Sequence, residues 1–467
     1  MALADVGGVI AAVEIVAHEA ALFAAVGFLI GGIDDLAIDL VYFLRAALRG
    51  RRRRPDPDLA DFTAQAPLRR FAVLVPAWDE AAVIGGMLRT ALARLDHPDY
   101  RILVGAYPND RATIDLVAQI AAGDPRVLLV VHHRDGPTTK ADCLNQLWHA
   151  LARDDARHGR RTDAVVLHDA EDVVHTGELR IFDALLGSAD VVQLPVLPLV
   201  DRTSRLVSGH YIDEFAEAHG KQMLVRQALR AGLPLAGTGC AIRRDMLDRV
   251  AAARGGDPFD ATSLTEDYEL GLTIAAMGGR GRFARVLEAA GGRPVAIRAY
   301  FPATIDAAVR QKARWMTGIA LAGWDRIGWG RAHQLTDHWM RMRDRRALLA
   351  VILLASAYCS LVLWAVSAGA GWFAGRPGTV LAPWFWWLLV ANAGLLLWRL
   401  ALRAAFVGML YGRGEALLSV PRMVVGNAIT LLAARRAVFR YVASLRGREL
   451  RWDKTSHHFP AGVDPAG

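Results

Sequence analysis

Cysteine is scarce in this chain of 467 residues, and the three that occur, Cys143, Cys240 and Cys359, lie far apart. That spacing fits neither a disulfide framework nor a metal site of the CxxC type. Two glycine motifs are also missing, because neither GxGxxG nor GxxxxGKS/T opens any predicted helix. A Rossmann dinucleotide site and an ATP-hydrolase phosphate loop therefore have little support.

Charge of either sign is absent from two long stretches, residues 347–375 and 377–398. Each exceeds the roughly 20 residues that a helix needs to cross a membrane. The net charge of +8 comes partly from arginine clusters within residues 45–54 and 341–346, which flank the apolar stretches. The positive-inside rule places such clusters on the cytoplasmic side. Nucleic-acid-binding proteins gather basic residues beside stacking aromatics instead, so we expect membrane lipids as partners and no nucleic acid.

Two further apolar segments are less regular. Residues 6–33 contain three ionisable side chains, so this segment either spans with a polar face against other helices or lies partly in the interface. Residues 415–435 contain Pro421 and Arg422, which favours an interfacial helix over a further span. We predict an N-terminal membrane segment with a basic linker, a cytoplasmic domain, a group of transmembrane and interfacial helices, and a cytoplasmic tail, at residues 1–67, 68–330, 331–435 and 436–467.

Four short apolar runs alternate with longer helical stretches in the predicted cytoplasmic domain. They cover residues 71–76, 101–107, 127–132 and 164–168, and the separations are long enough for crossover helices. Strands that alternate with helices predict an α/β fold with a mostly parallel sheet, inserted between the membrane helices. In such sheets, ligands bind beyond the carboxyl ends of the strands.

Acidic residues follow all four predicted strands, within Ala77–Glu80, Pro108–Asp110, His133–Gly136 and Asp169–Asp172. Carboxylates that converge on one sheet edge repel one another. A divalent cation, or a phosphate-bearing ligand that carries one, would relieve that repulsion. The sequence therefore predicts a cation or phosphate site at this edge.

Asp169 and Glu171 alternate after the fourth run, so both side chains point to the same side and can hold a hard cation that bridges a diphosphate. A pair of acidic residues with this spacing often occurs by chance in a solvated loop. The position at the end of a strand favours a cation-binding site instead. Thr265, Glu266 and Asp267 begin a predicted helix. Asp267 could act as a general base, although on the tripeptide alone a helix cap is the favoured interpretation.

A third motif places Gln311, Arg314 and Trp315 on one helical face, at positions i, i+3 and i+4. The guanidinium can hold diphosphate oxygens, and the indole offers a flat surface to a sugar or base. An amphipathic helix against the membrane would carry the same residue types. Residues 311–315 alone support the two interpretations equally.

The order of these motifs resembles that of membrane-embedded, inverting family 2 glycosyltransferases such as cellulose and hyaluronan synthases. The resemblance covers residues 70–320. The segments His168–His175, Gly31–Leu36 and Trp452–Pro460 look like the bacteriophage adsorption protein B branch. This resemblance implies a GT-A-type nucleotide-sugar-binding fold in a bacterial inner membrane protein.

The resemblance also implies roles for individual residues. The nucleoside would contact Ala77, Glu80 and Asp110, and the diphosphate would contact Lys140. Asp169 and Glu171 would bind the diphosphate and Mg²⁺ or Mn²⁺. The family has Asp at the position of Glu171, so the adjacent Asp172 is an alternative metal ligand. Asp267 would be the catalytic base, with Glu266 beside it. The remaining carried-over positions are Gln311, Arg314 and Trp315 for the donor diphosphate and acceptor sugar, and Gly237 and Gly239 for the acceptor site.

On this basis we expect single displacement from a nucleotide-diphospho-sugar, a UDP-sugar, with inversion at the anomeric carbon. The favoured acceptor is a growing polysaccharide, with export through the spans and an outer-membrane partner. Transfer of one sugar to a lipid acceptor is an alternative. A membrane scaffold or phage-entry component without catalysis is another, although a scaffold has no need for a base, a carboxylate pair and the third motif together.

Overall fold

The computed structural model describes residues 2–51, 56–62, 68–375, 380–447 and 458–460, with side chains from Gly7 onward. A seven-stranded sheet forms the centre of the large domain, in the order β3-β2-β1-β4-β6-β5-β7. The strands are β1 Phe71–Pro76, β2 Tyr100–Ala106, β3 Val127–Val131, β4 Ala164–Leu167, β5 Val191–Gln193, β6 Cys240–Arg243 and β7 Gly281–Phe283. Strands β1 to β4 run parallel, and only β6 is antiparallel to its neighbours β4 and β5. The predicted mostly parallel sheet is confirmed.

All four predicted apolar runs form strands, and β1 has the expected bounds. Phe71 lies in register with Tyr100 of β2 on one side and with Ala164 of β4 on the other. The carboxyl ends of β1, β2 and β4 therefore lie at one edge, which brings the acidic loops after them together.

Both faces of the sheet are covered because alternate residues of β1 point to opposite sides. Val73 and Val75 pack on one face with α2, α3 and α5, whereas Ala72 and Leu74 pack on the other with α4, α8 and α9. Every residue of β1 is buried. The six covering helices are α2 Ile84–Arg94, α3 Arg111–Gly123, α4 Lys140–His158, α5 Glu178–Leu185, α8 Arg244–Ala253 and α9 Glu266–Ala276.

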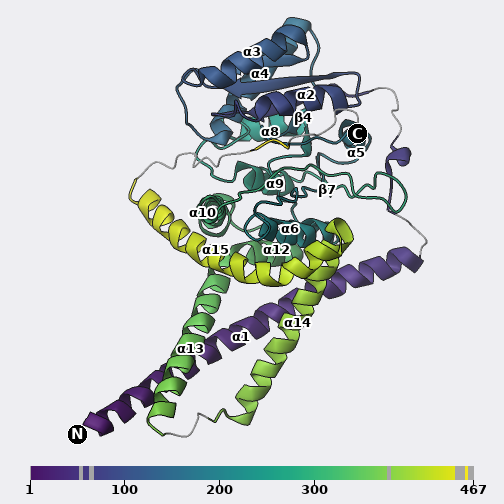
Figure 1. Cartoon of the computed structure of the whole chain (residues 1–467). Helices are drawn as coiled ribbons and strands as arrows, with labels where there is room; N and C mark the ends of the chain where they lie inside the picture. Colours follow the sequence, from purple (N-terminus) through teal and green to yellow (C-terminus); the bar gives the residue numbers. More distant parts are fainter. Residues whose placement is uncertain (1, 52–55, 63–67, 376–379, 448–457, 461–467) are drawn as a thin grey trace.

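Four helices in the described part of the chain are long and apolar enough to cross a membrane. They are α1 Ala2–Arg51, α13 Ala347–Phe373, α14 Pro383–Tyr411 and α15 Arg413–Leu445. Figure 1 shows α13 and α14 extending away from the sheet domain, while α1 crosses them along a diagonal. α1 is one continuous helix and is much longer than the segment 6–33 expected from the sequence. Arg52 to Arg54, at the end of the N-terminal arginine cluster, lie outside the described residues.

Helix α15 meets the length and composition criteria for a span, yet it runs crosswise to α13 beneath the sheet domain (Figure 1). It packs against α6 and α10 of that domain. The predicted boundary at residue 435 falls within this helix, and of the predicted tail 436–467 residues 436–447 and 458–460 are described. Phe459 packs against the core at Gly86 of α2.

Shorter helices connect the sheet domain to the membrane helices. They are α6 Gly209–Glu217, α7 Met223–Ala228, α10 Ile305–Trp315, α11 Gly323–Ile327 and α12 Leu335–Arg345, with a 3₁₀ turn at Leu59–Asp61 and π-helical turns at Ala218–Gln222 and Met316–Ala322.

Ion pairs fix α1 against the connecting helices. Arg343 and Arg346 both donate to Asp35, each at 2.8 Å, and both also pair with Asp34. One turn further along, Asp39 pairs with the buried Lys221. Because each partly buried carboxylate meets an arginine or lysine, the domain is held in one orientation on α1.

Candidate active site

A cavity of about 450 Å³ opens beside the carboxyl ends of β1 and β4. The loops after these strands, the start of α9 and one face of α10 bound it. The sequence-predicted residues that line it are Glu80, Lys140, Asp169, Glu171, Glu266, Asp267, Gln311, Arg314 and Trp315. The fold thus brings residues more than 200 positions apart in the sequence into one cavity.

The loop after β4 is held by its third carboxylate. Asp172 accepts hydrogen bonds from the backbone N–H of Asp169 at 2.8 Å and from the hydroxyl of Thr238. Asp172 is only 2% exposed. Its side chain is therefore engaged within the loop, whereas Asp169 is one-third exposed at the cavity.

His168 holds this loop through its contact with Asp172, a role that the sequence did not reveal. Its buried ring lies between Asp172 and Glu178, with Nδ1 and Nε2 each 2.9 Å from a carboxylate oxygen. Burial alone would lower the pKa of His168, but the charges of Glu178 and Asp172 raise this pKa to about 10. His168 is therefore a buried imidazolium. The signal in the sequence was a histidine at the end of an otherwise apolar strand, where it needs polar partners.

The acidic pair Glu266 and Asp267 forms the first turn of α9. Thr265 occupies the N-cap position, but its side chain makes no capping hydrogen bond. The helix-cap interpretation is therefore correct for the positions of these residues, but the threonine hydroxyl does not cap the helix. Burial and the neighbouring Asp267 raise the pKa of Glu266 to about 7. Burial also raises the pKa of Asp267, against the opposing charge of Lys140.

Lys140 lies among these carboxylates at the start of α4. Its ammonium donates to Asp169 and to the backbone carbonyl of Gly237 at 3.2 Å, and it lies 4.0 Å from Glu266. Burial opposes its charge, but Asp169, Glu266 and Asp267 raise the pKa of Lys140 above its usual value. Lys140 is therefore a fixed positive charge in the cavity.

Gly237 fits closely between two of these groups. Its φ of +75° is in the left-handed region, and a Cβ here would lie 2.6 Å from the Asp267 carboxylate and 3.1 Å from Lys140 Nζ. Any other residue would displace the charged groups. Gly237 thus lies directly behind Asp267 and Lys140, which line the cavity, but it is not itself part of the lining.

Helix α10 presents Gln311, Arg314 and Trp315 to the cavity. Gln311 Oε1 is buried and has no hydrogen-bond partner among the described residues. Trp315 is oriented by edge contacts with Tyr211 at 6.0 Å between ring centroids. A buried amide oxygen without a partner is costly, which indicates that a ligand group completes it.

Besides Gly237, three predicted site residues lie outside the cavity lining. Ala77 is fully buried and its N–H donates to Gly105, so it continues strand pairing. Asp110 caps α3 and accepts a hydrogen bond from the N–H of Asp79 at 2.6 Å, which places it one residue from Glu80. Gly239 N–H donates to Leu167 of β4.

An apolar wall opposite the carboxylates was not anticipated. It consists of Phe215, Met223, Pro234, Tyr300 and Phe301, with the buried ring of His219 among them. These residues come from α6, the π-turn after it, the start of α7 and two loops, and no local motif in the sequence marks them. Only the tertiary fold brings them to the cavity.

Two carboxylates of the cavity are candidate ligands for a divalent cation. The described residues contain no group of three or more His, Cys, Asp or Glu side chains arranged to hold a metal ion. Asp169 and Glu171 nevertheless offer two hard oxygen ligands at the cavity. Mg²⁺ is commonly held by one or two carboxylates together with substrate phosphates, so the residues fit a cation that shares its coordination with a diphosphate.

The sequence was compared with known proteins. Residues 67–318 match the family described as glycosyltransferase like family 2. Bacteriophage adsorption protein B of Escherichia coli strain K12 and bacteriophage N4 adsorption protein B of Escherichia coli O157:H7 are each 36% identical to the chain over 470 residues, which covers 94% of it. The chain spans 62% of the length of these relatives.

Among solved structures, the mannosyltransferase PcManGT from Pyrobaculum calidifontis, in complex with GDP-Man and Mn²⁺, has a similar fold. The two structures superpose with a TM-score of 0.52 at 17% sequence identity, covering 92% of this chain and 99% of the mannosyltransferase. This similarity supports the GT-A-type fold. Since the family match covers more than half of the chain and contains the whole cavity edge of the sheet, the protein belongs to the glycosyltransferase like family 2.

Proposed function

We propose that the protein is an inverting glycosyltransferase of the bacterial inner membrane that transfers a sugar from a UDP-sugar to a growing polysaccharide. One observation carries the proposal. A buried acidic pair with raised pKa values, Glu266 and Asp267, lines one cavity together with two cations, Lys140 and Arg314, and Lys140 Nζ lies 4.0 Å from Glu266. A base beside a binding site for negative charge is the combination that displacement of a diphosphate requires.

Asp267 is the base. Its carboxylate accepts the proton of an acceptor hydroxyl while that oxygen attacks the anomeric carbon from the side opposite the diphosphate. The bond between the anomeric carbon and the diphosphate oxygen breaks, and the nucleoside diphosphate leaves with both electrons of that bond. Because burial raises the pKa of Asp267, it is a stronger base than a solvated aspartate.

The cations stabilise the leaving group. Lys140 is held by Asp169 and Gly237, so its charge stays at the β4 side of the cavity. Arg314 approaches from α10 and can donate two parallel hydrogen bonds to phosphate oxygens. Gln311 and Trp315 would orient the diphosphate and the acceptor sugar beside it.

Asp169 and Glu171 would hold Mg²⁺ or Mn²⁺. When bound, such a cation supplies positive charge against the departing diphosphate. The engagement of Asp172 by Thr238 and the N–H of Asp169 supports Glu171 as the second ligand. Glu266, 4.0 Å from Lys140, contributes charge to the environment of the base.

The nucleoside would lie against Glu80, with Ala77 and Asp110 shaping the strand end and loop behind it. The close approach of Gly237 to Asp267, with Gly239 in the same turn, supports an acceptor path along this turn and the wall of Phe215 and Phe301.

Domain organisation and location follow the same proposal. Residues 68–330 would lie in the cytoplasm between the membrane segments 1–67 and 331–435, with 436–467 as a cytoplasmic tail. Export of the product through the spans, with an outer-membrane partner, belongs to this proposal.

A lipid acceptor is the second candidate. It is favoured by the apolar cavity wall and by the packing of α10 on α15, which lies beside the membrane helices. The names of the two Escherichia coli relatives also make a role in phage adsorption a candidate, which a protein without catalysis could fill.

The test uses the full chain purified into nanodiscs. We expect release of UDP from at least one of a panel of UDP-sugars in the presence of Mg²⁺ or Mn²⁺, and Asp267→Asn should abolish it. Asp115→Asn, which removes an exposed carboxylate on α3, is the matched control and should behave as wild type.

Product size separates the acceptors. A ladder of long products supports a polymerase, and a single glycolipid supports transfer to lipid. No release from any donor, or full release by Asp267→Asn, would contradict the catalytic proposal.

A further inference from the structure

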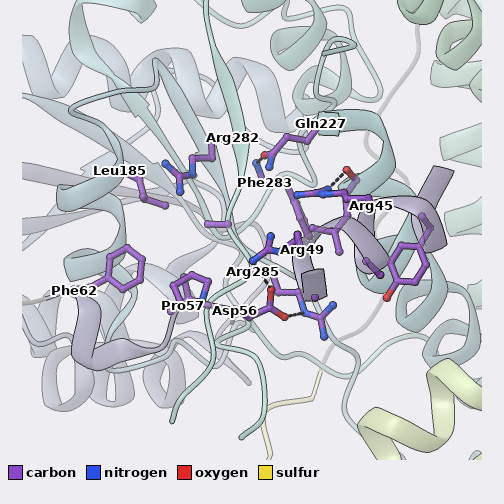
Figure 2. Close-up of a pocket in the computed structure, with 16 residues that line it drawn as sticks. Arg45, Arg49, Asp56, Pro57, Phe62, Leu185, Gln227, Arg282, Phe283 and Arg285 are labelled. Atoms are coloured by element: carbon purple, nitrogen blue, oxygen red, sulfur yellow. Dashed lines mark hydrogen bonds and ion pairs between the residues drawn. The ribbon is translucent and has the colours of Figure 1, made fainter. Parts of the chain in front are cut away.

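A second cavity of about 450 Å³ lies where α1 ends against the sheet domain. It shares no lining residue with the catalytic cavity. Figure 2 shows its walls: the last turns of α1, the segment at Asp56 and Pro57, and the strand β7 with the residues after it. The proposed function does not use this cavity.

Guanidinium groups dominate its walls. Arg45 and Arg49 come from α1, one turn apart, and Arg282 and Arg285 come from β7 and the residues just after it. Asp56 is the one carboxylate among the described residues of the lining. Four formal positive charges against one negative charge leave an excess of positive charge around the cavity, which is open to solvent at Arg282.

Asp56 cannot compensate for this excess. Its carboxylate is shared between Arg49 at 3.0 Å and Arg285 at 3.6 Å (Figure 2). Arg45 donates instead to the backbone carbonyl of Leu224, which carries no net charge. Arginines that converge without enough carboxylates repel one another, and a bound anion would remove that repulsion.

The chemistry and the size of the cavity both indicate a phosphate-bearing ligand. Guanidinium groups bind phosphate oxygens in pairs, with fixed geometry. The floor is apolar, formed by Phe62, Leu185, Leu224 and Phe283. A cavity of this size exceeds what one inorganic phosphate fills, so the ligand has an organic part that packs on the apolar floor.

The position on α1 indicates where such a ligand comes from. Leu44 and Leu48, next to the two cavity arginines along the helix, are 54% and 53% exposed. This final part of α1 therefore presents apolar residues outward and arginines toward the domain, as a helix does at the headgroup level of a membrane. The negatively charged headgroups of a membrane lie at the same level.

We infer that the cavity between the end of α1 and β7 binds a phosphate-bearing anion through Arg45, Arg49, Arg282 and Arg285, with an anionic phospholipid headgroup as its source. Bound there, the headgroup bridges α1 to the sheet domain and neutralises the arginines that Asp56 leaves uncompensated.

The experiment titrates the detergent-purified full chain with phosphatidylglycerol or phosphatidylcholine of identical acyl chains and follows the thermal unfolding midpoint. Phosphatidylglycerol should raise the midpoint at a concentration about tenfold lower than phosphatidylcholine, because charge-assisted hydrogen bonds are lost with the neutral headgroup. Arg282→Gln/Arg285→Gln should abolish this preference. Arg153→Gln/Arg157→Gln, two exposed arginines of α4, removes the same charge and should preserve it.

Pyrophosphate and sn-glycerol 3-phosphate form the soluble arm of the test. If they give the shift that Arg282→Gln/Arg285→Gln abolishes, and phosphatidylglycerol gives none, the anion site stands and its ligand is soluble.

Arg282→Lys/Arg285→Lys keeps the charge without the planar fork, and it should fold and bind phosphatidylglycerol with intermediate affinity. If no probe separates wild type from both the glutamine and the lysine variants, with folding verified by circular dichroism, the inference is wrong.

Discussion

The catalytic cavity and the arginine cavity at the end of α1 have the same volume, about 450 Å³, but their walls carry opposite charge. In the catalytic cavity, Asp169, Glu171, Glu266 and Asp267 outnumber the cations. In the arginine cavity, four guanidinium groups face the single carboxylate of Asp56. The carboxylates of the first cavity therefore suit a cation or a proton-donating hydroxyl, whereas the guanidinium groups of the second suit an anion.

Proton exchange separates the two cavities further. Burial moves the pKa of Glu266 to about 7, so this group can change its charge near neutral pH. Guanidinium groups remain charged at every accessible pH and cannot act as bases. An acidic cavity with buried carboxylates can do chemistry, whereas an arginine cavity can only bind, and the following changes test that distinction.

After Asp267→Asn, the largest effect is expected from Asp169→Asn. Loss of one of the two proposed metal ligands should lower kcat/KM for donor turnover about a thousandfold, because a metal ion supplies several kcal/mol of charge stabilisation. UDP release should be measured across a titration of Mn²⁺. Activity that is unchanged at every concentration of Mn²⁺ would remove Asp169 from the proposed site.

His168→Gln should destabilise the fold by about 3–5 kcal/mol, because it leaves the buried carboxylates of Asp172 and Glu178 without their cation. His149→Gln, which removes an exposed pair with Asp257, should cost less than about 1 kcal/mol. Chemical denaturation measures both values.

The same variant has a pH signature. Because the pKa of His168 is raised in the folded state to about 10, its ionic contribution is fully present below about pH 6.5 and is lost as the pH rises toward 10. The stability difference between wild type and His168→Gln should shrink over that window. A difference that is constant with pH would mean that His168 is neutral in the folded state.

A smaller effect is expected from pH on turnover. Burial raises the pKa of Glu266 to about 7 and also raises the pKa of Asp267, so kcat/KM should fall about tenfold per pH unit on the acidic side of an apparent pKa above that of a solvated carboxylate. Glu266→Gln removes one of the two titrating groups and should shift this limb to lower pH. A limb that begins only below pH 5 would indicate a solvated base.

The smallest effect on catalysis is expected at the other cavity. Arg282→Gln/Arg285→Gln should change kcat/KM by less than about twofold in neutral detergent, because the two cavities share no residue. A loss as large as that of Asp169→Asn would show that the two regions act as one site, and the comparison would fail.

The sequence was sufficient for the parts of the fold that depend on continuous local patterns. Strands β1, β2 and β4 are buried apolar runs, β3 is a half-buried apolar run, and acidic loops follow all four, so both the parallel sheet and the cavity edge were predictable. Strands β5 and β7 have only three residues each, which is too short for a hydrophobic period to identify.

Features that depend on distant residues could not be predicted. His168 becomes a buried cation only because the carboxylates of Glu178 and Asp172 pack beside it. The arginine cavity joins Arg49 to Arg285, which are separated by most of the sheet domain in sequence. Asp110 was correctly placed at a strand end, but its engagement as a helix cap depends on Thr113 and Asp79.

The most direct test of the central claim compares UDP binding with UDP-sugar turnover in wild type and Asp267→Asn, on the same nanodisc preparation. If Asp267 is the base of the catalytic cavity, kcat should fall about a thousandfold while the Kd for UDP changes by less than about threefold. If turnover survives the substitution, or if binding and turnover are lost in equal measure, Asp267 is not the base.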